Sequence, residues 1–194
     1  MLKAMRWRRR RSTERVGLPA TIEPVFVVGI DPGLSRCGYG AVASGAGGLS
    51  ARAIGVIRTA PTDPLPERLA ELQLELRALF AELQPDVVAV ERIFFQNNVR
   101  TAMSVGQASG LAMAEAIAAG CQVAQYSPNE VKLAVTGDGA ADKQQVQMMV
   151  QRLLGLAAPP KPADAADAAA LALCHLAHAP AQARIRAATA GARS

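Results

Sequence analysis

The sequence predicts an α/β protein built on a mixed five-stranded sheet flanked by helices. Three strand-like stretches follow one another early in the chain, and the turn at residues 44–48 favours an antiparallel meander. Two further short apolar runs are separated by helical stretches, so the sheet is expected to be mixed. With 194 residues, 51% of them hydrophobic, the chain can bury one good core, and we expect one domain with tails.

The first 24 residues are polar and basic, and we expect a flexible arm there. Residues 1–15 carry seven basic residues and one acidic residue, whereas residues 16–194 carry 14 basic and 15 acidic residues. The formal net charge of +5 therefore belongs to the arm, and the body is nearly neutral. A basic arm suggests a polyanionic partner, although runs of like charge are also often simply disordered.

The first predicted strand ends at an acidic residue. Residues 25–30 are apolar and mostly β-branched apart from one glycine, and Asp31-Pro32-Gly33 forms a turn after them. Ligands bind at the carboxyl ends of strands in open α/β sheets, so Asp31 is placed for metal or phosphate chemistry. The alternative is a turn aspartate that bonds its own backbone.

Later elements follow from apolar periodicity and from capping signals. The other strands are expected at 37–43, 51–58, 87–90 and 122–126. Helices are expected at 65–83, 101–119, 128–136, 142–153 and 163–179. Glu91 follows the strand at 87–90 and places a second carboxylate at a strand end, while Ser127 and Glu130 have the spacing of a capping box.

The alanine-rich helix at 163–179 begins with two further acids. Asp164 and Asp167 are three residues apart and therefore share one face of the helix. The alternative explanation is the helix macrodipole, which favours acidic residues in a first turn by about 0.3–1 kcal/mol each. Convergence with Asp31 and Glu91 would put four acids in one pocket, and such a pocket is stable only when it holds cations. Oxygen ligands favour Mg²⁺ or Mn²⁺ over zinc, and two such ions can cut a phosphodiester.

Five short motifs resemble the RuvC family of Holliday-junction resolvases over residues 25–179. They occur in the family's order: residues 29–33, 38–40, 90–94, 106–108 and 163–168. The resemblance implies a ribonuclease-H-like fold, and we expect the nuclease domain at residues 25–180. The last residues, 181–194, match no family pattern and are expected to form a flexible tail. It also implies Mg²⁺ dependence, with two ions per site and Mn²⁺ as a substitute, and paired nicking of four-way DNA junctions in recombination and repair.

The resemblance also implies roles for individual residues. Asp31, Glu91, Asp164 and Asp167 match the family's metal-binding catalytic acids. Phe94 matches an aromatic residue used on unpaired bases at the junction centre, and the expected DNA-binding set also contains Arg92, Lys132 and Lys143. A branch-migration motor complex is the protein partner that the resemblance implies.

A homodimer is expected, because two matched nicks in a two-fold symmetric junction need two identical sites. The helix at 101–119 is the expected interface, with small residues for close approach: Ser104, Ala108, Gly110 and Ala112. The alternative is that this helix simply packs on its own sheet.

Other functions and sites fit the sequence less well. An actin-like or sugar-kinase-like ATPase needs a second lobe, and an inert junction-binding protein would be expected to lose an acid. An RNA-processing nuclease of the same fold stays open. His175 and His178 are expected to be packing or surface residues. Three cysteines without a disulfide framework, no membrane span and no secretory signal predict a cytoplasmic protein.

Overall fold

The computed structural model describes residues 24–92 and 99–191, with the backbone alone at 99–101 and 179–191. The strands of this part of the chain are β1 (Phe26–Asp31), β2 (Arg36–Gly45), β3 (Gly48–Arg58), β4 (Val87–Glu91) and β5 (Gln122–Tyr126). The helices are α1 (Leu65–Leu83), α2 (Val99–Ala118), α3 (Pro128–Thr136), α4 (Lys143–Leu153) and α5 (Ala163–Gly191).

The strands form one mixed sheet in the order β3-β2-β1-β4-β5. The first three strands are an antiparallel meander, and β1–β4 and β4–β5 are parallel pairs. The predicted mixed five-stranded sheet is therefore confirmed. Because β1 and β4 are parallel neighbours, Asp31 and Glu91 end up at the same edge of the sheet.

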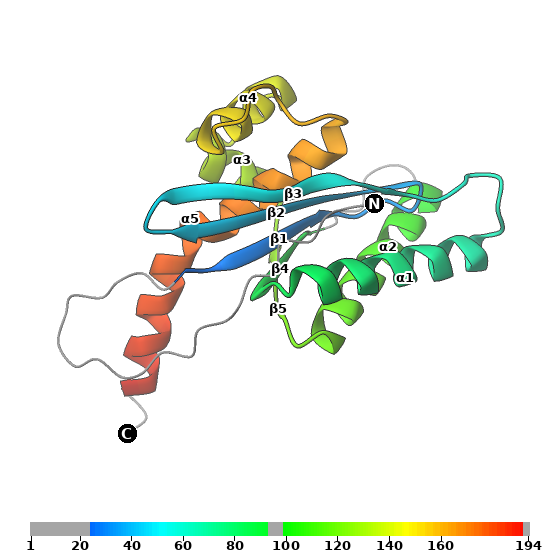
Figure 1. Ribbon diagram of the computed structural model, residues 1–194, viewed down its shortest axis with the longest axis horizontal. Coiled ribbons are helices and arrows are strands. Elements are labelled where there is room, and N and C mark those ends of the chain that lie inside the picture. Colours follow the sequence, from blue (N-terminus) through cyan, green and yellow to red (C-terminus); the bar gives the residue numbers. More distant parts are fainter. Residues whose placement is uncertain (1–23, 93–98, 192–194) are drawn as a thin grey trace.

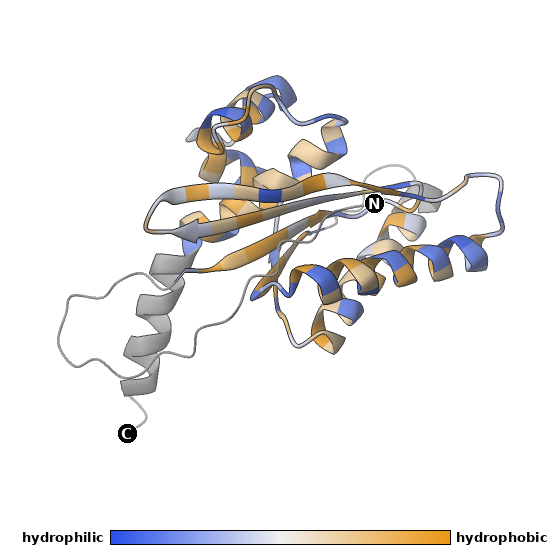
Figure 2. Cartoon of the chain, viewed as in Figure 1, coloured by the Kyte–Doolittle hydropathy of each residue, from blue (hydrophilic) through white to orange (hydrophobic). Residues whose placement is uncertain are grey.

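Helices cover both faces of the sheet, α1 and α2 on one face and α3, α4 and α5 on the other (Figure 1). Side chains alternate along a strand, so each central strand contributes to two cores. Val28, Ile30 and Val88 pack with α1 and α2, whereas Val27 and Val87 pack with the other three helices. In Figure 2 the sheet is largely hydrophobic, while α1 alternates hydrophobic and hydrophilic residues along its length.

Helix α5 lies against a strip of glycines on β1 and β2. A Cβ atom at Gly29 would lie 1.9 Å from the Ala168 carbonyl oxygen, and one at Gly38 would lie 2.1 Å from the Asp164 carbonyl oxygen. Only glycine allows this close approach between a strand and a helix backbone. The strip therefore brings the first turn of α5, with its two aspartates, down onto the end of β1.

Helix α2 is held to α1 through a buried carboxylate. Glu115 is 5% exposed, and its two oxygens accept hydrogen bonds from Arg77 Nε and Nη2 at 2.9 Å and from Gln73 Nε2 at 2.7 Å. Ala108 and Ala112 lie on the same inner side and are fully buried against their own domain. The expectation that these two alanines face a second chain is therefore wrong.

A different face of α2 is exposed. Met103 and Ile117 are 62% and 63% exposed, and small residues lie between them on the same side of the helix. The exposed positions from Met103 to Ile117 are Met103, Gly106, Gln107, Gly110, Ala114 and Ile117. They recur at intervals of three and four residues, so they form one stripe along the helix. We call these six residues the α2 stripe.

Helix α5 is longer than predicted. The sequence pattern placed its end near Ala179, before Pro180, but the helical backbone continues to Gly191 through another alanine-rich stretch. Alanine is the strongest helix former, which accounts for the extension. The division of the chain into an arm, a nuclease domain and a tail stays a prediction, and residues 1–23 lie outside the described part. No helix among the described residues is long and apolar enough to cross a membrane.

Candidate active site

Four acidic side chains meet at the carboxyl ends of β1 and β4. Asp31 is the last residue of β1 and Glu91 the last residue of β4, and both lie on the α5 side of the sheet by strand alternation. Asp164 and Asp167 come from the first turns of α5, which the glycine strip holds against β1 and β2. The structure thus brings the four predicted acids together from two strands and one helix.

The pKa of Asp31 is raised from 3.8 to about 7. Burial is the largest cause, because the charged form loses its hydration. The negative charges of Glu91, Asp167 and Asp164 raise this pKa further, in that order, while Lys143 opposes them. A nearby cation would therefore favour the ionised form of Asp31.

The pKa of Glu91 is shifted by the same neighbours. Its pKa is raised, first by burial and then by the charge of Asp167. A hydrogen bond with Asp31 and the charge of Lys143 act in the opposite direction. A hydrogen bond between two carboxyl groups needs a proton on one of them, which agrees with the raised pKa of both.

Two basic side chains lie against the α5 acids. Lys143 Nζ is 3.2 Å from Asp167 Oδ2, and this neighbour raises the pKa of the lysine. Arg36 Nε is 3.3 Å from Asp164 Oδ2. Lys143 was predicted for the DNA-binding face, whereas Arg36 was missed. The signal available for Arg36 was its place at the start of the strand paired with β1, since antiparallel pairing puts that start beside Asp31.

The donor set fits a hard divalent cation. Oxygen ligands suit Mg²⁺ or Mn²⁺, and the mutual repulsion that raises the pKa of Asp31 is the kind that such a cation relieves. Among the described residues, no three of the carboxylates are yet close enough to form a finished coordination shell. The chemistry of the site therefore fits a metal, and its side chains would have to draw closer around one.

The remaining predicted site residues lie apart from this cluster or outside the described residues. Lys132 is half-buried on α3. The Arg92 guanidinium contacts the Gln125 carbonyl and the Glu130 carboxylate, neither of which belongs to the four-acid cluster. Phe94, predicted to stack on unpaired bases, lies outside the described residues.

The raised pKa of Asp31 predicts a pH dependence of stability in metal-free protein. Below about pH 4 the carboxyl is protonated in both the folded and unfolded states, and its contribution to stability is fully present. As the pH rises toward about 7, the unfolded chain loses the proton first, so folding stability falls by a few kcal/mol. Thermal unfolding in a chelator between pH 4 and 8 measures this loss.

Asp31→Asn is the matched variant for that measurement, because it removes the charge and keeps the shape. We expect the stability of the variant to change much less between pH 4 and 8 than that of the wild type. At pH 8 the variant should be the more stable of the two. Equal pH dependence in the two proteins would show that Asp31 ionises normally in the fold.

A mixed sheet of this order, with carboxylates converging from two parallel strand ends and a helix, defines a nuclease of the ribonuclease-H-like class. The family model described as "Crossover junction endodeoxyribonuclease RuvC" matches residues 27–175. A curated protein of that name from Salinispora arenicola is 57% identical over 152 residues, covering 77% of this chain and 86% of the relative. The chain therefore belongs to the RuvC family of crossover junction endodeoxyribonucleases.

Solved structures agree with this assignment. The RuvC structure of Thermus thermophilus is 37% identical, with a TM-score of 0.75 and coverage of 81% of this chain and 96% of that one. The T. thermophilus RuvC in complex with a Holliday junction substrate is 38% identical, with a TM-score of 0.76 and coverage of 80% and 94%.

Proposed function

We propose that this protein resolves four-way DNA junctions by paired symmetric nicks, using a site formed by Asp31, Glu91, Asp164 and Asp167. The observation that carries the proposal is the convergence of these four acids from the ends of β1 and β4 and the start of α5. Such a cluster is costly for a fold unless it holds cations. Two Mg²⁺ ions are the proposed occupants, and Mn²⁺ is the proposed substitute.

The residues have separate tasks in this proposal. Bound Mg²⁺ ions would supply an activated water and stabilise the leaving oxygen of phosphodiester hydrolysis. The four carboxylates would hold these ions, with Asp31 at the centre of the cluster. Lys143 and Arg36 hold Asp167 and Asp164 by ion pairs, and both basic side chains would also be available to the DNA phosphates.

The DNA-binding surface is proposed on the same side of the molecule. Lys132 would contact phosphates from α3, as Lys143 would from α4, and Phe94 would stack on an unpaired base. A cytoplasmic location and association with a branch-migration motor complex complete the proposal. Both rest on membership of the family.

The test of the function compares substrates. The protein with Mg²⁺ should cut a synthetic four-way DNA junction much faster than a linear duplex of the same sequence or a structured RNA. An RNA-processing nuclease of the same fold would show the reverse preference between junction and RNA.

We propose a two-fold dimer that joins through the α2 stripe. The stripe is apolar apart from Gln107 and carries Gly106, Gly110 and Ala114, which let another helix approach closely. We expect Gly110→Arg or Ala114→Arg to give a folded monomer, because a large charged side chain blocks that approach. Analytical ultracentrifugation at micromolar concentration measures the oligomeric state, and nick mapping measures the loss of paired cleavage.

The control is Ala112→Arg, which lies on the buried side of α2. It should unfold the chain instead of splitting a folded dimer, because it inserts a charge into the core shared with α1. A wild-type monomer with full resolving activity would contradict the dimer, as would paired nicking by the Gly110→Arg monomer.

A further inference from the structure

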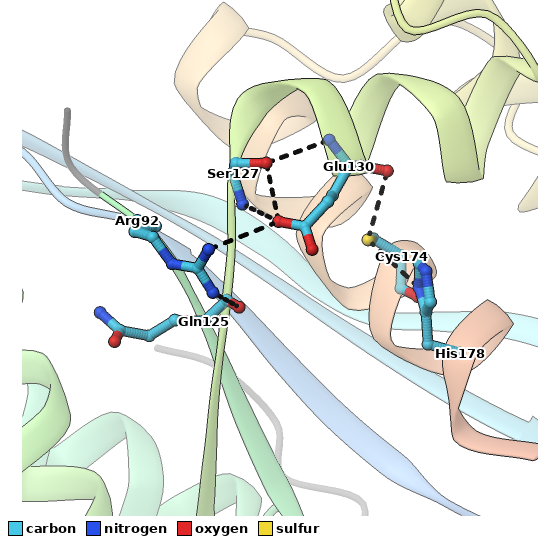
Figure 3. Close-up of polar contacts among 6 residues, drawn as sticks. All are labelled: Arg92, Gln125, Ser127, Glu130, Cys174 and His178. Carbon is cyan, nitrogen blue, oxygen red and sulfur yellow. Dashed lines mark hydrogen bonds and ion pairs between the residues drawn. The ribbon is translucent and has the colours of Figure 1, made fainter. Parts of the chain in front are cut away.

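Arg92 and Glu130 form a clamp at the exit of β4, together with Gln125 and Ser127 (Figure 3). We propose that Arg92 and Glu130 are positioning residues that hold Glu91 in the acidic cluster, and that Arg92 serves this role instead of binding DNA phosphates. This inference rests on the proposed function, since it takes Glu91 to be a metal-binding acid.

Arg92 is held in place by contacts of both its backbone and its side chain. Its backbone N–H donates to the Tyr126 carbonyl at 2.7 Å, and its Nη2 donates to the Gln125 carbonyl at 3.1 Å. Its Nη1 is 3.9 Å from Glu130 Oε2. All three contacts go to the end of β5 and the start of α3, so they fix the direction in which the chain leaves β4.

Glu130 is itself held in place by the first turn of α3. Its Oε2 accepts hydrogen bonds from the Ser127 backbone N–H and from the Ser127 hydroxyl, both at 2.7 Å. These hydrogen bonds are the largest causes that lower the Glu130 pKa, with smaller contributions from the charges of Arg92 and His178. The carboxylate is therefore a fixed negative charge, and the helix start decides where Arg92 can place its guanidinium.

The clamp also reaches the helix that carries the other two acids. The Cys174 thiol, on α5, donates to the Glu130 carbonyl at 3.7 Å, and His178 Nδ1 lies 2.8 Å from the Cys174 carbonyl. The Tyr126 hydroxyl and His175 Nδ1 share a hydrogen bond at 2.8 Å, which gives this buried histidine a polar partner. The start of α3 is thus fixed relative to α5 as well as to β5.

Glu91 depends on such support because of its place in the sheet. It directly precedes Arg92 and pairs with Tyr126, so it lies at the last paired position of β4. A frayed strand end would let its carboxylate turn away from Asp31 and Asp167. The contacts of Arg92, the next residue in the chain, oppose that movement.

A DNA-binding role for Arg92 would compete with these contacts. Its charge already faces a carboxylate and a carbonyl, and the Glu130 carboxylate would lie beside the DNA. Residues that orient metal ligands typically contribute about 10–100-fold to metal affinity or activity. A positioning role and a phosphate-binding role for Arg92 therefore predict different results.

Glu130→Gln and Arg92→Gln are the test variants. Glutamine at position 130 can still complete the capping box with Ser127, so it removes the charge that holds Arg92 and keeps the helix start. Both variants should lower Mg²⁺ affinity, measured by calorimetry without DNA, and should lower kcat on saturating junction by about 10-fold or more. The double variant should be no worse than the worse single variant, because both break one contact.

Junction binding separates positioning from phosphate contact. Arg92→Gln should leave the junction Kd and its salt dependence near wild-type values, whereas the comparison variant Lys132→Gln should lower the log-log salt slope by about 0.9. A salt slope lowered to the same extent by Arg92→Gln, with kcat and Mg²⁺ affinity unchanged, would overturn the inference. If Glu130→Gln alone left kcat and Mg²⁺ affinity unchanged, the clamp would also be excluded.

The two proposals can fail separately. Should the wild type not cut junctions while the variants still weaken Mg²⁺ binding, the clamp stands and the proposed function fails. Should the wild type cut junctions while neither variant changes Mg²⁺ affinity or kcat, the function stands and the clamp fails.

Discussion

Replacing Asp31 by asparagine is expected to slow junction cleavage by about a thousandfold or more, with junction binding close to the wild-type level. Asparagine keeps the size of the side chain and removes the charge that holds the metals, whereas binding rests on contacts of basic residues with phosphates. Single-turnover cleavage and a binding titration in Ca²⁺ separate the two effects.

Unfolding cannot explain that loss, because Asp31→Asn removes the repulsion that raises the pKa of the wild-type group. The variant should be at least as stable as the wild type above pH 7 in the absence of metal. Glu91→Gln is expected to behave in the same way. Glu82→Gln is the control, since Glu82 is exposed near the end of α1, at the opposite edge of the sheet, and cleavage should not change. Cleavage by Asp31→Asn at near the wild-type rate with Mg²⁺ would refute the metal assignment.

Gly38→Ala is expected to weaken both the fold and the activity. The added methyl group would meet the Asp164 carbonyl at 2.1 Å, so the first turn of α5 must move away from β2. Overpacking of this kind costs about 1–3 kcal/mol, and the shift also carries Asp164 and Asp167 away from Asp31. Denaturant unfolding and cleavage rates measure the two consequences.

Gly45→Ala provides the matched control for Gly38→Ala. Gly45 ends the same strand, and a Cβ atom there meets nothing within 4 Å, so stability and cleavage should stay close to wild type. If Gly38→Ala also kept wild-type stability and cleavage, helix α5 could not lie on the glycine strip as described.

Local signals in the sequence predicted much of the fold. The predicted capping box forms at Ser127 before α3, and helix α4 follows Asp142 as expected. The strand ends at Asp31 and Glu91 were predictable because a short apolar run is followed at once by a turn or a charged residue. Placing them side by side required only that the two strands be neighbours, which the alternation of strands and helices favoured.

Features that depend on side-chain orientation could not be predicted in the same way. Helix α2 has small residues all round, so nothing in its sequence separates the buried Ala108 and Ala112 from the exposed stripe. Arg92 carries a charge suited to DNA, and only the fold shows that β5 and α3 engage it. The end of α5 was predicted too early, near Ala179, although the alanine-rich sequence continues beyond Pro180.

The central claim is that two copies of this site make two matched nicks in a four-way junction. The most direct measurement labels each of the four strands of an immobile or locally mobile junction in turn and maps every nick made by the wild-type protein in Mg²⁺. The account predicts nicks at symmetry-related phosphates in two opposing strands, and none without a divalent cation. Nicks in one strand only, at unrelated positions, or unchanged in a chelator would contradict it.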